Sequence, residues 1–562
     1  MMLKDFIKVL LAVLAVTLIR QSLGLSNFHA GIDDSNIYFV YVKNLYEGNG
    51  FVYNFDGPRV EGFTSFLWTL VLALIYSIRI LPFETSILVL CFFITTLTVY
   101  QFFRFVKNLF SESLGLFIVA YMVLMPGFID WNVFTLMDLC LWILAGSWAI
   151  LLLLNGKNPR TFFVLTVLLP FIRPEGMALS FILVFLRMVK DYAVNLPVKD
   201  ILKKNAGLLL AVIGSVALLT AFRLAYFGYP FPNTFYAKVS MSLADNIRMA
   251  AFYLYDAVRH TSFIPFLLLA FTLGYLLFRK YWASWRSHIN ILVLVLIILF
   301  FIGYPFLTGG DHFKYSRFFQ PVFPLTGLLF LLIFGKWMGA GRPAMIIAGL
   351  IILVLANLNS TDDSSFRNNL SWAFTGYFRG LRPDLVSSSQ LQSEFDIGEN
   401  GRKLAGHMNL VTSTCDSLPS YGVIAAGGIG YVYEGQTIDL MGLNNPAMAH
   451  ADKIKSKGVK NHGSFNKKVF YEQDVDIFLT WPDPLTDKMQ QDDQSALLFL
   501  ERLQDSTYFI NRICGNIFND ADFRSRYQFS KISNGKDYLY GFVKQADFGR
   551  KYPCLQVHSP GN

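Results

Sequence analysis

The sequence predicts a polytopic α-helical membrane protein that ends in one soluble domain, and three observations support this fold class. Of the 562 residues, 54% are hydrophobic and only 15% are charged, whereas a soluble protein is typically about 25% charged. Apolar runs follow one another as far as Leu358, and residues 359–562 are mixed polar sequence. The five cysteines are too few for a disulfide scaffold. These values exclude an ordinary cytosolic enzyme and a disordered chain.

A membrane-spanning helix needs about 20 predominantly apolar residues. Candidate runs lie at 6–24, 65–83, 86–104, 113–129, 139–154, 160–173, 176–189, 206–226, 262–278, 289–307, 321–337 and 343–358. Lys4 and Lys8 precede an apolar core, as in a signal peptide, but no clear small-x-small cleavage site precedes residue 30. We therefore expect an uncleaved first span with its N-terminus inside.

Lysine and arginine in the short loops predict the topology. Basic loops lie around residues 104–107, 157–160, 187–204, 279–286 and 336–342, and the positive-inside rule places them in the cytoplasm. Alternation then places the loops 25–64, 227–261 and 308–320, and everything after 358, outside. Two runs, 65–83 and 86–104, separate an outer loop from an inner loop, so one of them must be re-entrant or interfacial. The sequence thus predicts about eleven spans.

The first outer loop holds two adjacent carboxylates, Asp33 and Asp34. Ile37, Val40, Tyr41 and Leu45 follow at helical spacing, which predicts an amphipathic helix on the membrane surface. The aspartates fit two roles. They are typical of a helix N-cap, or one of them removes the proton of an acceptor hydroxyl as a general base.

Other charged side chains stand at the outer ends of apolar runs, where they are costly unless paired or facing a polar cavity. Glu61 precedes Trp68, which is also typical of an interfacial anchor. Arg173 and Glu175 fit either a pair at a helix turn or a functional site. The remaining candidates of this kind are Asp138, Arg223, Asn233, Lys238, Asp311, His312 and Arg317.

Arginine and lysine are the side chains that hold phosphate, as a fork and as a point charge. Arg223 and Lys238 fit this role, although they are also typical of side chains that snorkel to lipid headgroups. No spacing of histidines predicts a metal site around His312. The sequence has no Walker A loop and no G-x-G-x-x-G after a strand. We therefore expect a lipid-phosphate donor at the outer face, and no nucleic acid.

These loops resemble one known family. The matching stretches are Asp33-Asp34, Glu61–Trp68, Arg173–Gly176, Arg223 with Gly228 and Pro232–Lys238, Gly309–Asp311 with Arg317-Phe318, and Asp439–Leu443 with His462. Together they resemble the GT-C glycosyltransferases similar to the terminal arabinofuranosyltransferase of mycolate-type cell walls. The matches span residues 33 to 462. Where the family often has S-G-M/L-E-T, this sequence has Thr135–Leu139, with Asp138 as a shorter acid and no glycine.

The resemblance implies a GT-C bundle in a bacterial inner membrane that moves a sugar, such as arabinofuranose, from a polyprenyl-phosphate donor. The acceptor is a cell-envelope glycan or glycolipid, and the anomeric carbon inverts. The resemblance implies Asp33 as the general base, with Asp34 orienting it or the acceptor. The resemblance leaves open whether these two carboxylates hold a divalent cation.

The same resemblance implies a donor site that neutralises the departing phosphate, which is the largest electrostatic contribution to such a reaction. The residues implied for this phosphate are Arg173, Arg223, Lys238 and Arg317. Further residues implied for substrate binding are Glu175, Asn233, Asp311 and His312. Other implied site residues are Glu61, Asp138, Asp439 and His462.

The C-terminal part, 359–562, predicts an α/β or α+β domain outside the membrane that binds the acceptor. Short apolar stretches such as Val423–Ile429 and Val475–Trp481 alternate with helical ones such as Ala496–Leu503. Three of the cysteines lie in this domain, where oxidation is permitted. We expect a disulfide between Cys514 and Cys554, with Cys415 unpaired; three free cysteines are the alternative.

Two other classes of protein share some of these features. A transporter or flippase of lipid-linked sugars would have the bundle and the cationic outer loops. It would also need a charged pathway toward the cytoplasm, and the inner loops carry only scattered basic residues. A non-catalytic envelope-binding protein would need far fewer spans than the sequence predicts. The transferase therefore ranks first.

Overall fold

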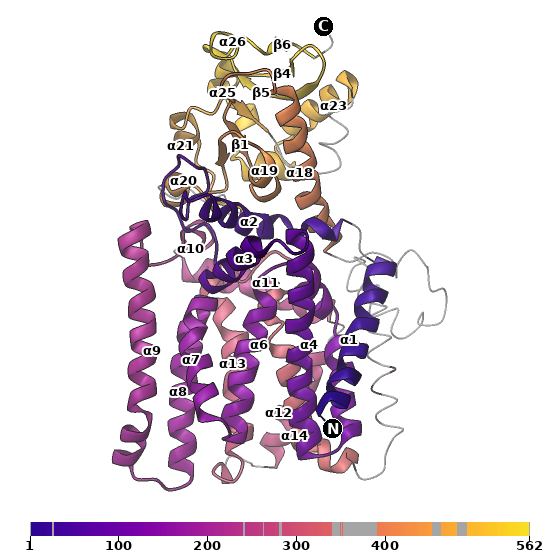
Figure 1. Ribbon diagram of the computed structural model, residues 1–562, viewed down its shortest axis with the longest axis vertical. Helices are drawn as coiled ribbons and strands as arrows, with labels where there is room; N and C mark the ends of the chain where they lie inside the picture. The colour runs from indigo at the N-terminus through magenta and orange to yellow at the C-terminus, as the bar shows by residue number, and fades with distance from the viewer. Residues whose placement is uncertain are drawn as a thin grey trace.

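The computed structural model describes residues 2–24, 27–239, 242–261, 264–279, 284–339, 349, 351, 391–451, 462–479 and 492–560. Figure 1 shows a bundle of helices from the first part of the chain, with the C-terminal domain stacked on one end of it. Helix α2 lies across that end, between the bundle and the domain (Figure 1). The expected boundary at residue 358 lies outside the described residues.

The N-terminal part is helical throughout its described ranges. Its elements are α1 (Met2–Gly24), η1 (Phe28–Ala30), α2 (Asp33–Tyr46), α3 (Phe66–Ile78), α4 (Phe83–Leu109), α5 (Glu112–Val123), the π-helix η2 (Asp130–Phe134), α6 (Leu139–Asn155), α7 (Pro159–Ile172), α8 (Glu175–Ala193), α9 (Val198–Phe227), α10 (Asn233–Lys238), α11 (Leu243–His260), α12 (Ile264–Phe278), α13 (Ile289–Thr308), η4 (Arg317–Phe319) and α14 (Val322–Gly339).

Four of the described helices are long and apolar enough to cross a bilayer. They are Phe83–Leu109, Val198–Phe227, Ile289–Thr308 and Arg317–Met338. Helices α3, α5, α6, α7 and α12 are apolar but shorter. Helix length therefore does not confirm the expected number of about eleven spans. The last predicted run, 343–358, lies outside the described residues except for 349 and 351.

The lengths of two helices distinguish between the apolar runs 65–83 and 86–104, of which only one should cross the membrane. Helix α3 has 13 residues, which is about 20 Å at about 1.5 Å per residue and less than the ~30 Å of a hydrocarbon core. Helix α4 has 27 residues and is long enough. Figure 1 shows α3 beside α2 at the end of the bundle that faces the soluble domain. Trp68 in α3 is fully buried, so it is not an interfacial anchor.

Glycines end the two helices that lead into the outer loops. Gly228 follows α9 at a φ of 83°, and Gly309 follows α13 at a φ of 83°. Residues with a Cβ avoid this left-handed conformation, so glycine is the usual residue that ends a helix in this way. The chain therefore leaves both helices at fixed points, and the short segments with Lys238 and Arg317 begin close to the end of the bundle.

The C-terminal domain is a mixed sheet covered by helices, which confirms a sheet domain of the predicted type. Its elements are α18 (Gln392–Val411), β1 (Tyr421–Val423), α19 (Gly427–Val432), β2 (Thr437–Asp439), α20 (Pro446–His450), α21 (Lys467–Glu472), β3 (Ile477–Phe478), α23 (Asp493–Gln504), α24 (Phe509–Ile513), η5 (Ile517–Asn519), α25 (Ala521–Arg526), β4 (Tyr527–Ser533), β5 (Tyr538–Lys544), α26 (Phe548–Lys551) and β6 (Gln556–His558).

The sheet has the strand order β2-β1-β3-β5-β4-β6. Strands β2, β1 and β3 are parallel, and β5, β4 and β6 continue the sheet in antiparallel order. Turns follow the carboxyl ends of the parallel strands β1 and β2. Ligands of parallel sheets bind at this edge, and here the edge faces helix α2 of the bundle (Figure 1).

The expected disulfide between Cys514 and Cys554 is wrong. Cys554 bonds to Cys415, and their Cα atoms are 5.3 Å apart. Cys514 is a fully buried thiol inside a hydrophobic cluster around Phe518 and Phe523. The pairing depends on the tertiary fold, because the bond joins the segment after α18 to the segment after α26 across 139 residues.

Candidate active site

Asp33 and Asp34 lie in the first turn of α2, and neither is its N-cap, which is Ile32. Asp33 reaches the soluble domain instead. Its Oδ2 accepts the N–H of Gly427 at 3.0 Å, and its Oδ1 accepts the N–H of Gly428 at 2.8 Å. A Cβ on Gly427 would lie 1.8 Å from the backbone oxygen of Asp33. The two segments therefore approach closely only because residue 427 is glycine.

Asp34 faces two cations of the bundle. Its Oδ2 lies 3.4 Å from Nζ of Lys238 and 3.5 Å from Nη1 of Arg317. Arg317 also donates from Nε to Oδ2 of Asp311. The other oxygen of Asp311 accepts the backbone N–H of His312 at 2.9 Å. Arg317 is thus held between two carboxylates, with Lys238 and His312 beside it.

One pocket at the seam between the bundle and the soluble domain collects these groups. It has about 520 Å³ of space, part of it open to solvent. Its polar lining comes from Asp33, Asp34, Lys238, His312, Glu394, Asp439 and His462. The structure therefore brings polar residues from six separate stretches of the sequence to one cavity.

The two adjacent aspartates titrate in opposite directions. Burial raises the pKa of Asp33 to about 7, although the N–H groups of Gly428 and Gly427 favour its charged form. Burial also acts on Asp34, but the positive charges of Lys238 and Arg317 outweigh it and lower its pKa. Asp34 is therefore ionised at neutral pH, and Asp33 exchanges its proton there. A general base works best when its pKa is near the working pH.

Glu394 is a pocket carboxyl that the sequence did not indicate. It stands in the first turn of α18, and burial raises its pKa while His312 opposes that shift. The ring of His462, also from the soluble domain, lies 4.9 Å from the ring of His312. The soluble domain therefore contributes a carboxyl and an imidazole to the same pocket as the two aspartates of the first outer loop.

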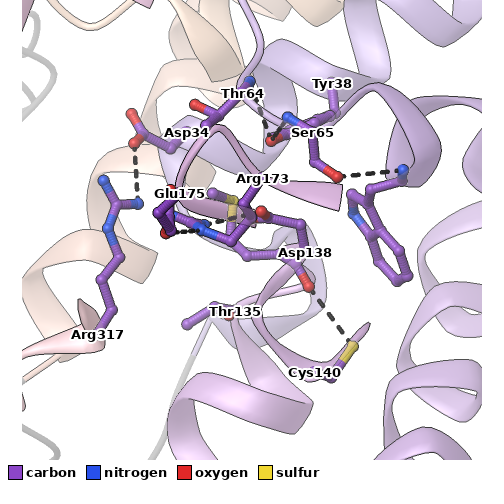
Figure 2. A network of polar contacts seen from close by, with 12 residues as sticks. Asp34, Tyr38, Thr64, Ser65, Thr135, Asp138, Cys140, Arg173, Glu175 and Arg317 are labelled. Carbon is purple, nitrogen blue, oxygen red and sulfur yellow. Dashed lines mark hydrogen bonds and ion pairs between the residues drawn. The ribbon is translucent and has the colours of Figure 1, made fainter. Parts of the chain in front are cut away.

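Arg173 forms a buried network next to the pocket (Figure 2). Its Nη1 donates to Oδ2 of Asp138 at 2.8 Å, and its Nε donates to Oε1 of Glu175 at 2.5 Å. Phe318 lies 5.5 Å from the guanidinium of Arg173 and 5.4 Å from that of Arg317. Asp138, although a short acid, thus reaches its partner. The ring of Phe318 thus lies next to both guanidinium groups. Arg173, Asp138 and Glu175 are not among the described residues that line the pocket.

Glu61 and Arg223 form a second buried pair. Nε and Nη2 of Arg223 donate to the two carboxylate oxygens of Glu61 at 2.7 and 2.8 Å, and both side chains are 1% exposed. Burial raises the pKa of Glu61, although the hydrogen bonds and the positive charge of Arg223 favour its charged form. The pair connects α9 with the first outer loop, away from the described residues that line the pocket.

Asp439 holds a turn. Its carboxylate accepts the N–H groups of Met441, Gly442 and Asn444 at 2.8, 3.1 and 2.8 Å. Asn233 donates to the carbonyl oxygen of Gly442 at 2.7 Å, so it binds this turn. The hydrogen bonds of Asp439 and Asn233 therefore fix the soluble domain against the outer loops.

Gly62 makes the matching contact from the first outer loop. A Cβ at this residue would lie 1.9 Å from Oδ1 of Asn444 and 2.6 Å from the hydroxyl of Tyr41. Asn444 lies in the turn that Asp439 holds. The stretch Glu61–Trp68 thus contacts the turn that begins at Asp439.

The two carboxylates of the first outer loop already have partners in the protein. Among the described residues, no three histidine, cysteine, aspartate or glutamate side chains form a group that could hold a metal ion. Asp34 already faces two cations, and Asp33 has a backbone N–H on each oxygen. In the step proposed below, the side chains themselves act on the substrate.

The sequence missed Glu394 and the pair Gly427-Gly428. Their function depends on where the soluble domain docks, and no local pattern indicates this. The only available signal was the adjacent glycines in an otherwise apolar stretch, because such glycines permit close backbone contact.

Solved structures share this architecture. The oligosaccharyltransferase of Archaeoglobus fulgidus, in its apo form, matches 97% of this chain and 74% of its own with a TM-score of 0.50 and 11% identity. ArnT from Cupriavidus metallidurans, bound to undecaprenyl phosphate, matches 79% of this chain and 87% of its own with a TM-score of 0.47 and 14% identity. No protein-family model and no curated protein matches the sequence. The oligosaccharyltransferase, a GT-C glycosyltransferase, shows that this chain has the GT-C fold.

Proposed function

We propose that this protein is an inverting glycosyltransferase that uses a polyprenyl-phosphate sugar as donor. Its acceptor is a glycan or glycolipid of the cell envelope at the outer face of a bacterial inner membrane. Arabinofuranose is the sugar that the sequence resemblance favours. The observation that carries the proposal is the pocket lined by Asp33, Asp34, Lys238 and His312, where Asp34 contacts both Lys238 and the adjacent Arg317.

The pocket has two chemically different sides. Lys238 and Arg317 can neutralise a phosphate, the lysine as a point charge and the arginine as a fork. Asp33 and Glu394 lie on the side of the soluble domain and carry carboxyls with raised pKa values. A substrate with a phosphate at the bundle side and a sugar toward the domain fits this division of charge.

The reaction follows from these positions. Asp33 removes the proton of an acceptor hydroxyl, whose oxygen bonds to the anomeric carbon on the face opposite the phosphate. The bond between that carbon and the phosphate oxygen breaks, and its electron pair stays on the departing polyprenyl phosphate. Lys238 and Arg317 stabilise the charge that develops there, which is usually the largest catalytic contribution. Asp34 positions both cations.

The placement outside the cytoplasm has independent support. The described basic loops around residues 104–107, 157–160 and 187–204 lie at the end of the bundle away from the soluble domain (Figure 1). The disulfide between Cys415 and Cys554 lies in the soluble domain, and disulfides persist in oxidising compartments. A lipid-linked donor suits this side of the membrane.

The test measures the release of free polyprenyl phosphate by the full-length protein in liposomes. The donors are polyprenyl-phosphate sugars, arabinofuranose included, and the acceptors are envelope glycans. We expect the wild-type protein to release polyprenyl phosphate and Asp33→Asn to lose release by about 10²–10⁴-fold, the usual contribution of a general base. Thermal unfolding of both proteins controls for correct folding.

The other outcomes are equally informative. Equal release by wild type and Asp33→Asn would move the base to Asp34 or Glu394. Absence of release with every donor, together with donor movement across the liposome membrane, would refute the transferase and support a transporter of lipid-linked sugars.

A further inference from the structure

A second cleft lies at the other end of helix α2. It has about 760 Å³ of space, part of it open to solvent, between the end of α2 with its following loop and the segment from α19 to β2. Asp33 is the first residue of α2, whereas Lys43 and Glu47 line this cleft. At about 1.5 Å per residue, the two ends are about 15 Å apart, so the cleft is separate from the pocket described above.

A rigid frame holds the cleft open. Asn44 donates to the backbone oxygen of Tyr53 at 3.0 Å, and the hydroxyl of Tyr53 donates to the carbonyl oxygen of Ala426. Asn54 pairs with the backbone of Thr437 in both directions, at 2.9 and 3.0 Å. These polar groups have their partners within the protein. They fix the loop against the soluble domain before any ligand binds, which lowers the entropic cost of binding.

Other polar groups of the cleft remain available. No described residue forms a hydrogen bond or an ion pair with the side chains of Lys43, Glu47 or Glu434. Phe55 is 56% exposed beside them. An exposed aromatic ring next to unpaired donors and acceptors is a binding arrangement, because the ring offers an apolar face and the others offer hydrogen bonds.

The side chains that line the cleft limit the class of ligand that it can bind. Two glutamates against one lysine disfavour a phosphate or another anion. The polar walls disfavour a lipid chain, which needs an apolar pocket. A neutral sugar fits, because its hydroxyls bond to carboxylates and ammonium groups while its C–H face packs on an aromatic ring.

We propose that this cleft binds a neutral oligosaccharide, at a sugar unit distant from the one that reacts. The identification of this ligand as the acceptor rests on the proposed function. Helices α2 and α19 connect the cleft with the pocket, since Gly428 bonds to Asp33 and Gly430 lines the cleft. A sugar unit bound at the cleft would therefore lie about 15 Å from Asp33 along α2, a distance that only an oligosaccharide of several units can span. The protein would accordingly prefer long acceptors to short ones.

The experiment measures direct binding to the full-length protein in detergent. The probes are fluorescently labelled neutral arabinan and mannan oligosaccharides, from disaccharides to octasaccharides. The variants are Phe55→Ala and Glu434→Gln. The matched control is Leu410→Ala, because Leu410 lies in the soluble domain and is also 56% exposed. We expect affinity to increase with length, and Phe55→Ala to weaken the binding of long probes about tenfold, or 1.4 kcal/mol, while Leu410→Ala binds as wild type does.

Equal affinity of wild type and Phe55→Ala for every probe would overturn the proposal, and so would absence of binding by the wild type. Polyprenyl-phosphate release by the wild type, measured in parallel with binding, separates this result from the proposed function. Binding that depends on Phe55, without release of polyprenyl phosphate from any donor, would retain the cleft as a glycan site and refute the transferase.

Discussion

At the scale of the residue, exposure to solvent separates two kinds of charged side chain. Glu61 and Arg223 form a fully buried pair, and the buried carboxylate of Asp439 accepts the N–H groups of a turn. Such groups hold the structure, because a buried charge persists only when it is paired. Asp34 and Lys238 also pair with each other, but their side chains are about 20% exposed at the pocket. The stretches of sequence that resemble the GT-C family therefore contain both structural residues and candidate catalytic residues.

The raised pKa of Asp33 predicts how the reaction depends on pH. Asp33 acts as a base only after it loses its proton, so the rate should rise as the pH increases through about 7 and level off above it. Asp33→Glu keeps a carboxylate and should keep this dependence at a lower rate. The measurement is the pH profile of polyprenyl-phosphate release at saturating donor. A rate that stays constant between pH 5 and pH 9 would contradict this assignment.

The pair of Glu61 and Arg223 predicts a large loss of stability. Glu61→Ala leaves an unpaired buried guanidinium, which should cost about 3–5 kcal/mol. The double variant Glu61→Leu with Arg223→Met should recover most of this cost, because both charges are then absent. Unfolding in detergent measures the effect. The exposed pair of Glu399 and Lys403 is the control, since Lys403→Ala should change stability by at most about 1 kcal/mol.

At the scale of the element, helix α2 joins the two parts of the protein. Its first turn bonds to α19 through Asp33. The hydroxyl of Tyr38 accepts the backbone N–H of Ser65 (Figure 2). The hydroxyl of Tyr41 accepts that of Gly62, so the helix also fixes the loop before α3. The predicted helix is thus confirmed, but the prediction of an amphipathic helix on the membrane surface is wrong, because the residues from Ser35 to Val42 are all buried between the bundle and the domain.

The substitution Gly427→Ala tests the junction between α2 and α19. A Cβ there would contact the backbone of Asp33 at 1.8 Å, so Gly427→Ala should push α19 away from α2 and cost about 1–3 kcal/mol. Loss of the N–H groups that favour the charged form should also raise the pKa of Asp33 further. The pH profile of the reaction should therefore shift to higher pH.

Gly406→Ala is the control for that variant. Gly406 lies in α18 with no atom within 4 Å of an added Cβ, so alanine should stabilise the helix by up to about 1 kcal/mol. Equal thermal unfolding of the two alanine variants would show that the junction tolerates a side chain at residue 427.

At the scale of the whole molecule, one disulfide joins distant parts of the soluble domain. Cys415→Ser should cost about 2–4 kcal/mol, because Cys415 and Cys554 are 139 residues apart in sequence. A reductant should lower the unfolding temperature of the wild type to that of this variant and leave the variant unchanged. Cys514→Ala should keep the sensitivity of the wild type to reductant. If the reductant affects all three proteins equally, the bond does not form.

The sequence by itself determined the helical bundle, the soluble domain and the outer-loop residues Asp33, Asp34, Lys238, His312 and Arg317. Apolar runs and charge distribution are local properties, so they can be read from the chain in order. Only the tertiary structure decided that Arg223 and Asn233 hold the frame, that Glu394 enters the pocket and that Cys554 pairs with Cys415. Each of these depends on how the soluble domain docks on the bundle, and close contact between segments far apart in sequence leaves no local pattern.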